Sequence, residues 1–354
     1  MQSFEYNALP GRVVFGRGTV ANVKAEVEAL GASQALVITT AQQESSGAVL
    51  LEKLGDCGAG IFAGAVMHTP VNVTEAALEF AADLGVDCLV AVGGGSTIGL
   101  AKAIALRTDL PQIAIPTTYA GSEATPILGQ TEDGIKTTQR GMEILPETII
   151  YDVELTLTLP VGLTVTSGLN AIAHSIEGLY ARDSNPIISM IAEEGIRALV
   201  SALPRIVEEP SNVDARSDAL YGSWGCGVTL GAVGMALHHK LCHVLGGTFD
   251  LPHSETHSVI LPHAMAYNAA HAPEAMMRAA RAIGDDNAPL GIWELSRSLG
   301  APLTLEEIGM PADCIEQVVQ LVLENPYWNP APLEAQRLRT LLQNAYSGLP
   351  PNSA

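Results

Sequence analysis

The sequence predicts a two-domain fold, with an α/β domain over residues 1–160 and an all-helical domain over residues 161–354. In the first part, short β-branched runs alternate with segments of helical periodicity. After Pro160 the strand signal disappears while helical periodicity continues. With 354 residues, of which 47% are hydrophobic, the chain can bury two cores. Alternating strands and helices predict a mostly parallel sheet that binds ligands at the carboxyl ends of its strands.

The elements of the first part follow from its apolar runs and their breaks. Strands are predicted at residues 12–16, 34–39, 60–65, 87–92, 112–116 and 148–152. Helices are predicted at residues 19–30, 43–54, 73–84 and 97–107. The segment 123–147, rich in threonine, glycine and charge, is expected to be a loop or a hairpin.

The second part is expected to contain helices only. They are predicted over residues 164–181 and 186–203, along an alanine- and glycine-rich stretch from 214 to 245, and after Pro262, Pro273, Pro289, Pro311 and Pro332. Glycine costs about 1 kcal/mol relative to alanine inside a helix. The glycines of the 214–245 stretch therefore indicate close helix packing.

The charge balance excludes some classes of partner. Lys and Arg number 18 against 38 Asp and Glu, which gives a net charge of −20. Such a surface repels nucleic acids and anionic membranes, so neither is expected as a partner. The first twenty residues lack the features of a signal peptide, and no apolar run has the length of a membrane-spanning helix. Five scattered cysteines without CxxC spacing favour neither disulfides nor a thiolate metal site, so we expect a protein of the reducing cytoplasm.

A glycine-rich turn, Gly93 to Ser96, joins the strand at 87–92 to the helix at 97–107. Glycines allow close approach of a pyrophosphate, and a helix start offers unpaired N–H groups and a positive dipole end. The turn is neither GxGxxG nor a Walker loop, and many such turns serve geometry alone. We favour a dinucleotide site. The expected contacts are Gly94, Gly95, Ser96, Thr97 and, after the strand at 112–116, Thr117 and Thr118, although a plain threonine-rich turn is nearly as well supported there.

The end of the second strand bears on the choice of dinucleotide. NAD specificity often rests on a carboxylate at this position, whereas here Thr39 and Thr40 follow the strand without an adjacent arginine. We expect Thr39 to contact the cofactor. NADH is the expected cofactor and NADPH is possible.

Histidine is concentrated in one stretch, because six of the nine histidines lie between His238 and His263. His239 and His243 are four residues apart, as are Asn170 and His174, and this spacing places both members of a pair on one helix face. His253 follows after a Gly-Gly pair. Such a cluster can be a metal site, an acid/base site or a set of hydrogen-bonded core histidines.

Four segments together resemble the iron-containing alcohol dehydrogenase superfamily, whose fold is that of dehydroquinate synthase. They are GGGSTIGLAKA, PTTYAGSE, LNAIAHSIEGLY and HHKLCHVLGGTFDLPHSETHSVILPH, in this order and at these separations. The opening NALPGRVVFG and the run HHKLCH are similar to the maleylacetate reductase branch. The resemblance covers nearly the whole chain and implies an α/β NAD(P)-binding domain followed by a helical catalytic domain.

The resemblance also implies positions for a metal and for the cofactor. Metal-dependent members bind Fe²⁺ or Zn²⁺ through one Asp and three His, and these positions fall on Asn170, His174, His239 and His253. Because Asn170 removes the anionic ligand, a divalent ion would bind more weakly. We expect no tightly bound metal; if an ion binds, His174, His239 and His253 hold it. Lys136 matches a lysine that contacts the cofactor in this superfamily.

The activity that the resemblance implies is NAD(P)H-dependent reduction of the C=C bond of maleylacetate to 3-oxoadipate, in the degradation of aromatic compounds, by a homodimer. His243 is expected to act as acid/base, with His239, His253, His174 and Asn170 around the substrate, while His238, His257 and His263 are expected to be core residues. The small dicarboxylate needs positive charge, which protonated histidines are expected to supply in part. Lys240 is turned about 100° around the helix from His239 and is a weaker candidate.

Three other functions remain open. A metal-dependent alcohol or polyol dehydrogenase of the same superfamily is the main alternative, and Asn170 argues against it. A lyase of the dehydroquinate synthase type would need a pocket rich in Lys and Arg, and this chain is poor in both. A non-catalytic nucleotide sensor leaves the histidine cluster unexplained.

Overall fold

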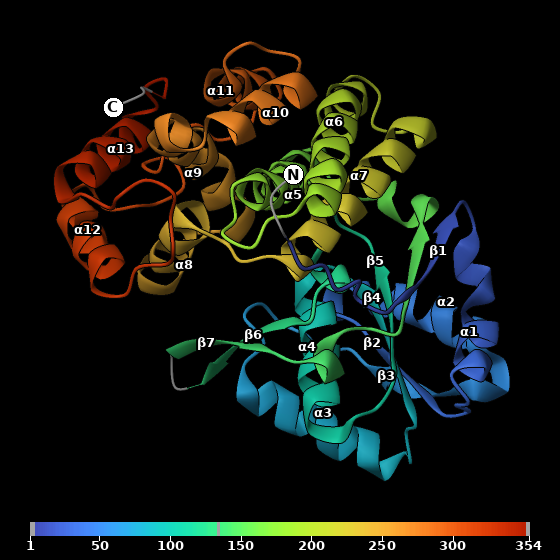
Figure 1. Ribbon diagram of the computed structural model, residues 1–354. Helices are drawn as coiled ribbons and strands as arrows, with labels where there is room; N and C mark the ends of the chain where they lie inside the picture. The colour runs from blue at the N-terminus through green and yellow to red at the C-terminus, as the bar shows by residue number, and fades with distance from the viewer. Residues whose placement is uncertain (1–3, 133–134, 352–354) are drawn as a thin grey trace. The chain divides into compact units, whose positions relative to one another are not determined.

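The computed structural model describes residues 4–132 and 135–351, which form two compact units (Figure 1). Residues 8–159 make up the first, which we call the sheet unit. The described residues from 160 onward, with residues 4–7, make up the second, which we call the helical unit. An α/β unit followed by a helical unit confirms the predicted fold class.

Six parallel strands form the sheet of the first unit. They are β1 (Arg12–Gly16), β2 (Ala35–Ile38), β3 (Gly58–Phe62), β4 (Cys88–Gly93), β5 (Gln112–Pro116) and β8 (Thr148–Asp152). Their order across the sheet is β1-β8-β5-β4-β2-β3, and each neighbouring pair is parallel. Four helices cover the sheet: α1 (Val23–Ala29), α2 (Glu44–Leu54), α3 (Val71–Asp83) and α4 (Gly95–Thr108). The predicted parallel sheet is confirmed.

Both faces of this sheet are buried. Val37 and Val90 point to one face, where they pack with residues of α1 and α2. Their neighbours Leu36 and Leu89 point to the other face and pack with residues of α3 and α4. Side chains alternate between the faces of a strand, so a sheet covered on both sides needs apolar residues at every position. Burial of both faces therefore explains why the strand sequences are nearly continuous apolar runs.

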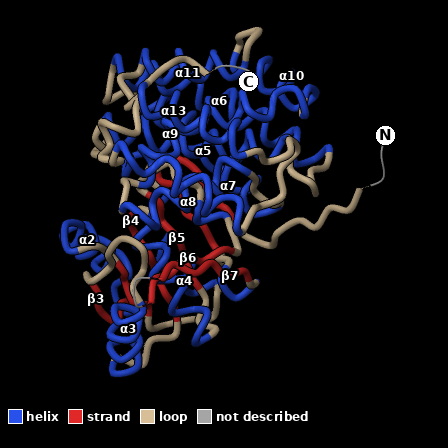
Figure 2. The backbone as a smooth tube through the Cα atoms, turned by 90° about the vertical axis from the view of Figure 1, so that its left-hand side faces the viewer, coloured by secondary structure: helices blue, strands red, loops and turns tan. Residues whose placement is uncertain are grey.

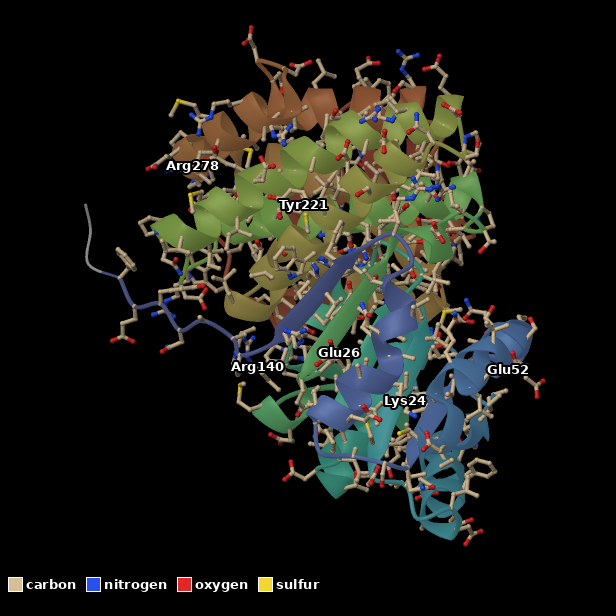
Figure 3. All side chains as sticks on the ribbon, turned by 90° about the vertical axis from the view of Figure 1, so that its right-hand side faces the viewer. Lys24, Glu26, Glu52, Arg140, Tyr221 and Arg278 are labelled. Carbon is tan, nitrogen blue, oxygen red and sulfur yellow. The ribbon has the colours of Figure 1, made fainter. Side chains whose placement is uncertain are left out.

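The edge strand β1 is tied to the helix beside it by a paired ionic contact. The Arg12 guanidinium donates to both carboxylate oxygens of Glu26 on α1, at 2.8 Å and 3.1 Å. Figure 3 shows Glu26 on this helix, near Lys24. Arg12 is largely exposed while Glu26 is buried. The contact therefore gives a partner to a carboxylate that would otherwise lie buried without one.

Two parts of the sheet unit refine the sequence prediction. The third strand spans 58–62 rather than the predicted 60–65, because Gly58 pairs with Ala35 of β2 through an irregular register. Glycine has low strand propensity, so the apolar pattern alone missed this start. Within the segment 123–147, β6 (Ile127–Glu132) and β7 (Ile135–Arg140) pair antiparallel. The hairpin alternative is thus the correct one.

The helical unit is a set of packed helices, drawn as blue tube in Figure 2. They are α5 (Val161–Leu179), α6 (Pro186–Glu208), α7 (Val213–Ala232), α8 (Leu237–Phe249), α9 (His253–Asn268), α10 (Pro273–Ile283), α11 (Ala288–Ser298), α12 (Ile315–Glu324) and α13 (Ala335–Ser347). Every residue of α5 from Thr164 to Leu179 is buried, and α6, α7, α9 and α10 pack against this helix. Across the described ranges no single helix could cross a membrane; only α7 and α8 taken together, with a 94° bend, have the length and composition for it.

The long helix predicted over 214–245 is instead two helices, and the prediction of one was wrong. Val233 has an extended backbone, which ends α7. Backbone N–H groups after it donate to acidic side chains instead of continuing the helix. Gly234 N–H donates to Asp183 at 3.0 Å and Ala236 N–H donates to Glu177 at 2.8 Å. These acceptors are far away in sequence, so local helix propensity could not reveal the break. The close packing predicted from the glycines is confirmed at Gly222, where a Cβ would lie 3.0 Å from the Gly195 carbonyl oxygen of α6.

Helix α9 begins earlier than predicted. It starts at His253 and contains Pro262 inside it, whereas a helix was predicted only after that proline. A proline inside a helix removes one hydrogen bond at a cost of about 3 kcal/mol. All residues from Thr256 to Asn268 are buried, and this packing offsets the loss. The earlier start places His253 and His257 on the same helix.

Candidate active site

The glycine turn lies where β4 ends and α4 begins. Gly93 has a φ of 152°, which favours glycine, and Gly94 precedes the helix without a side-chain cap. A Cβ on Gly94 would lie 3.0 Å from Thr118 Cγ2, while one on Gly95 would meet open space. The start of α4 therefore offers its dipole end, and the backbone at Gly95 is open to approach.

The threonines after β5 lie beside this turn. Thr117 N–H donates to the Gly93 carbonyl at 3.0 Å, which holds the ends of β4 and β5 together. Gln43, at the start of α2, donates its amide to Thr117 Oγ1 at 3.3 Å. Gly94, Thr117 and Thr118, which were predicted as cofactor contacts, thus lie close together in the structure. Gln43 lies beside them and was not predicted. Gln43 belongs to no recognised motif, and it follows β2 rather than β4 or β5 in the chain.

The other predicted cofactor residues have different surroundings. Ser96 is half-buried at the turn, whereas Thr97 is fully buried and its hydroxyl contacts no other polar group within the ranges described. Thr39 is also fully buried; its hydroxyl donates to the Thr40 carbonyl at 3.0 Å, and its methyl group packs against Gly47 of α2. Lys136 lies on β7 opposite Thr131, and its side chain falls outside the described part of the structure.

A buried lysine that the sequence analysis missed fixes the segment after Thr118. Lys102 on α4 donates to the carbonyls of Ser122, Thr125 and Ile127 at 2.5, 2.7 and 3.0 Å. Burial lowers the pKa of Lys102 to about 7, although the charge of nearby Glu123 acts to raise it. Glu123 is buried beside it, accepts a hydrogen bond from Tyr151 at 2.8 Å, and has a pKa raised by burial. Lys102 lies in the apolar periodicity of α4, so its role was not visible in the sequence.

Histidines from α8 and α9 gather beside His174 of α5. The ring centroids of His174 and His239 are 5.1 Å apart, as are those of His239 and His257. His253 and His257 stack at 4.3 Å, and His239 and His243 lie 6.1 Å apart. The structure therefore brings the four histidines predicted as catalytic into one group, and Asn170 lies four residues before His174 on α5. With His238 and His257 they form what we call the histidine cluster: Asn170, His174, His238, His239, His243, His253 and His257.

Several polar atoms of the histidine cluster are buried with no partner among the described residues. They are Asn170 Oδ1, His174 Nδ1, His239 Nε2 and both ring nitrogens of His257. Burial, and then the neighbouring histidines, lower the pKa of His174 and His257 well below the usual value. The same causes lower the pKa of His238 to about 4. These rings are neutral at pH 7, so the expectation that protonated histidines attract the substrate does not hold for them.

His238, His257 and His263 were expected to be core residues with satisfied hydrogen bonds. All three are buried, but among the described residues only His238 matches the expected hydrogen bonding, while His257 and His263 keep ring nitrogens without a partner. His238 Nε2 donates to the His257 carbonyl at 3.1 Å. The ring of His257 contacts those of His238, His239 and His253. The sequence analysis did not predict these contacts, because His257 belongs to neither of the two i,i+4 pairs. Ring nitrogens of His238, His239 and His257 lie within 4.8 Å of one another. His263 is buried, and burial lowers its pKa to about 4.

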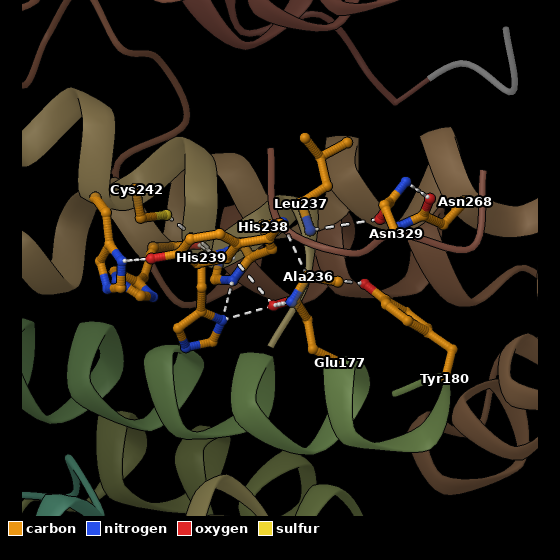
Figure 4. Close-up of polar contacts among 12 residues, drawn as sticks. Glu177, Tyr180, Ala236, Leu237, His238, His239, Cys242, Asn268 and Asn329 are labelled. Atoms are coloured by element: carbon orange, nitrogen blue, oxygen red, sulfur yellow. Dashed lines mark hydrogen bonds and ion pairs between the residues drawn. The ribbon is translucent and has the colours of Figure 1, made fainter. Parts of the chain in front are cut away.

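Glu177 is a buried residue in contact with His239 that the sequence analysis did not single out (Figure 4). It is fully buried and accepts a hydrogen bond from His239 Nδ1 at 2.8 Å. Burial opposes its ionisation, but the hydrogen bond from His239, the charges of His239 and His238, and the Ala236 N–H lower its pKa to about 2. Glu177 lies three residues after His174 on α5, the i,i+3 spacing that places two side chains on one face. That spacing was the signal in the sequence.

His243 lies at the half-buried side of the histidine cluster. Its Nδ1 is 3.0 Å from the hydroxyl of Tyr327, in the segment between α12 and α13. Lys240 Nζ stands 5.6 Å from the centre of the same tyrosine ring. Asn329 holds the segment in place, because its carboxamide exchanges hydrogen bonds of 2.9 and 2.7 Å with Asn268 on α9. His243 thus has a phenol and an ammonium nearby.

A parallel sheet with an open glycine turn and a helical unit with clustered neutral imidazoles together define a class of two-domain dehydrogenases. Residues 10–153 match the iron-containing alcohol dehydrogenase family, and residues 164–346 match the C-terminal part of the Fe-containing alcohol dehydrogenase family. The chain belongs to the iron-containing alcohol dehydrogenase family and is an oxidoreductase.

Similar proteins include several maleylacetate reductases. Those of Rhizobium sp. and Sphingobium indicum are 54% and 53% identical over 351 residues, which is 99% of this chain and at least 99% of each relative. The crystal structure of maleylacetate reductase from Agrobacterium tumefaciens has a TM-score of 0.97 at 55% identity, covering 99% of this chain and all of that one. A structure described as 1,3-propanediol oxidoreductase has a TM-score of 0.92 at 25% identity, with 98% and 100% covered. The resemblance predicted from the motifs is confirmed.

Membership of this family overturns the expectation that the protein holds no tightly bound metal, because iron-containing alcohol dehydrogenases imply a bound iron ion. The residues fit such an ion. Neutral imidazole nitrogens and an amide oxygen are suitable ligands for a divalent transition metal, and those of His174, His239 and Asn170 are buried without a protein partner in the described structure. The prediction was wrong because it rested on the lost anionic ligand at Asn170 alone, whereas neutral nitrogen and oxygen atoms also bind divalent transition metals.

Proposed function

We propose that this protein reduces the carbon–carbon double bond of maleylacetate with NADH and yields 3-oxoadipate, in the breakdown of aromatic compounds. The contact of His174 with His239, with the unpartnered Asn170 Oδ1 on the same helix as His174, carries this proposal in a chain 54% identical to a maleylacetate reductase over 351 residues. NADPH is a possible second cofactor, since neither a carboxylate nor an arginine follows β2.

The dinucleotide site proposed for the sheet unit is built around the glycine turn. The start of α4 and the open space at Gly95 suit a pyrophosphate, and the hydroxyls of Thr117 and Thr118 lie beside it. A bound dinucleotide supplies the hydride. Further contacts are proposed for Ser96, Thr97, Lys136 and Thr39.

The proposed chemistry of the histidine cluster follows the charge that develops on the substrate. When hydride adds to the alkene carbon distal to the ketone, negative charge appears on the ketone oxygen. Groups placed to meet that charge lower the barrier. A divalent ion held by Asn170, His174, His239 and one imidazole of α9, His253 or His257, would supply a Lewis acid there.

His243 is proposed to move the proton. The carbon next to the ketone must receive a proton once hydride has been added. His243 is half-buried, and the Tyr327 hydroxyl at 3.0 Å orients its ring. A positioned imidazole is suited to proton transfer near neutral pH. Lys240, beside Tyr327, adds positive charge that suits a dicarboxylate.

Assembly as a homodimer and a cytoplasmic location are also proposed. Strand β1 ends the order of the sheet, pairs with β8 alone, and keeps Phe15 exposed. An edge strand of this kind can pair with a second copy of the chain. The scattered cysteines of the sequence support a reducing compartment. Light scattering coupled to gel filtration measures the assembly directly.

The test of the proposed activity is NADH oxidation by the metal-loaded protein with freshly generated maleylacetate. We expect 3-oxoadipate as product, with one NADH consumed per molecule, and a kcat/KM at least 100-fold above that for NAD⁺-dependent oxidation of small alcohols and diols, a gap of about 3 kcal/mol. Turnover of alcohols without turnover of maleylacetate would instead establish the dehydrogenase alternative.

A further inference from the structure

We propose that Glu177 is a positioning residue for the metal ligand His239 and supplies the negative charge that the neutral ligand set lacks. The inference rests on the ligand set named in the proposed function, with Asn170 and His174 beside His239. It concerns a residue that touches neither substrate nor cofactor and acts through His239. Three observations in the helical unit carry it.

The first observation fixes the tautomer of His239. A carboxylate only accepts hydrogen bonds, so the 2.8 Å contact between Glu177 Oε2 and His239 Nδ1 places the ring proton on Nδ1. Nε2 then carries a lone pair. That atom is buried without a protein partner among the residues described, on the side of the ring that faces the histidine cluster. A ring held in this way presents a ligand atom to an ion.

The second observation is that the same carboxylate fixes the start of α8. Glu177 accepts from the backbone N–H groups of Ala236 and His238, both at 2.8 Å, and from that of His239 at 3.4 Å. Figure 4 shows Glu177 reaching from α5 to these groups at the helix start. The backbone and the ring of His239 are therefore held by one side chain. This links the bend between α7 and α8 to the direction of the ligand atom.

The third observation is the charge of the surrounding groups. An amide and neutral imidazoles leave a divalent ion with its full charge. Glu177 is fully buried and accepts five hydrogen bonds in all, with Tyr180 Oη at 3.4 Å as the fifth donor. A carboxylate with this many donors is anionic. The His239 ring, polarised by this contact, would pass part of that charge to a bound ion.

The main experiment measures metal affinity without substrate. The full chain is stripped with a chelator and titrated with Zn²⁺ in the presence of a competing chromophoric chelator. We expect Glu177→Gln to raise the Zn²⁺ Kd by 10- to 100-fold, the range typical for loss of a group that orients a metal ligand. The control Glu274→Gln removes an exposed carboxylate of α10, whose side chain is 79% exposed, and should leave the Kd unchanged.

A second substitution separates charge from shape. Asn170→Asp places a carboxylate directly among the ligands with little change in size. We expect it to lower the Zn²⁺ Kd of the wild-type protein, and the double variant Asn170→Asp/Glu177→Gln to return to within a few-fold of wild type. A Glu177→Gln protein that is folded by circular dichroism and binds Zn²⁺ as tightly as wild type would overturn the proposal.

A measurement on the wild-type sequence covers the case in which Glu177→Gln does not fold. Protein labelled with ¹⁵N-histidine reports the tautomer of each ring by NMR, and His239→Asn assigns the signal. The proposal requires the Nδ1–H form for His239, and the Nε2–H form would overturn it. Because neither measurement uses maleylacetate, failure of the proposed substrate leaves these results standing, and the reverse is also true.

Discussion

The reactivity expected of His243 depends on its partners. It shares a hydrogen bond of 3.0 Å with the Tyr327 hydroxyl, and burial raises the pKa of that phenol, so the hydroxyl stays protonated. A protonated phenol donates to an unprotonated imidazole nitrogen, so this contact fixes the orientation of the ring. His243 thus differs from His174 and His257, which lie deeper in the histidine cluster.

Replacement of His243 tests this assignment. We expect His243→Ala to lower kcat for maleylacetate reduction by about 100- to 10,000-fold, the usual contribution of a general acid or base. NADH binding, followed by fluorescence, should be unchanged because the glycine turn belongs to the sheet unit. Tyr327→Phe keeps the imidazole and serves as the matched variant, with a smaller loss and a shifted pH profile. Wild-type turnover in His243→Ala would remove this residue from the mechanism.

Residue identity could be predicted only where spacing revealed it. The i,i+4 pairs Asn170/His174 and His239/His243 pointed to one cluster, and the structure gathers both pairs. Glu177 and Gln43 were missed because their partners lie 62 and 74 residues away in the chain. The i,i+3 spacing of His174 and Glu177 indicates only that both lie on one helix face, and it does not reveal that Glu177 accepts hydrogen bonds at the distant start of α8.

At the scale of elements, α4 and the segment after β5 act as one piece. The Lys102 ammonium is surrounded by carbonyls of the segment Ser122–Ile127 and lies behind the turn that carries Thr117 and Thr118. Buried carbonyls that lose a charged donor are costly to leave unpaired. This contact stabilises the loop next to the proposed dinucleotide site.

Loss of that ammonium should destabilise the sheet unit. We expect Lys102→Met to lower the free energy of unfolding by about 2–4 kcal/mol, because several carbonyls lose their donor at once. Urea denaturation followed by circular dichroism measures the change. Lys53→Met, the same substitution at an exposed position of α2, should cost well under 1 kcal/mol. Equal stability of the two variants would contradict the role given to Lys102.

The elements themselves were largely predictable, since five of the six sheet strands begin within one residue of their predicted starts. Periodicity succeeds there because each strand buries both faces. It failed at the bend between α7 and α8, where Asp183 and Glu177 take the N–H groups that would continue the helix. It also failed at α9, because tertiary packing outweighs the proline at 262.

For the whole molecule, buried histidines make stability depend on pH. Burial lowers the pKa of His263 from 6.5 to about 4. Between these values the unfolded chain binds a proton that the folded chain does not, so acid favours unfolding. The stability is complete above pH 6.5 and is lost as the pH falls toward 4. His238, with a pKa of about 4, acts in the same direction.

The slope of unfolding free energy against pH tests this. We expect a wild-type loss of about 3 kcal/mol from His263 alone between pH 6.5 and 4, as the pKa difference requires. His263→Gln should remove that part of the slope, whatever its effect at pH 7. His271→Gln, at an exposed position, should retain the wild-type slope. Parallel curves for His263→Gln and wild type would show that His263 titrates normally in the folded protein.

The division of the chain at residue 160 has a consequence for how such enzymes diversify. The glycine turn and its threonines all precede Leu159, and the histidine cluster with Glu177 and Tyr327 all follows Pro160. Each set lies in one uninterrupted stretch of the chain. A single recombination event near codon 160 can therefore exchange a complete dinucleotide site or a complete histidine cluster, and the two can accumulate substitutions as separate heritable blocks.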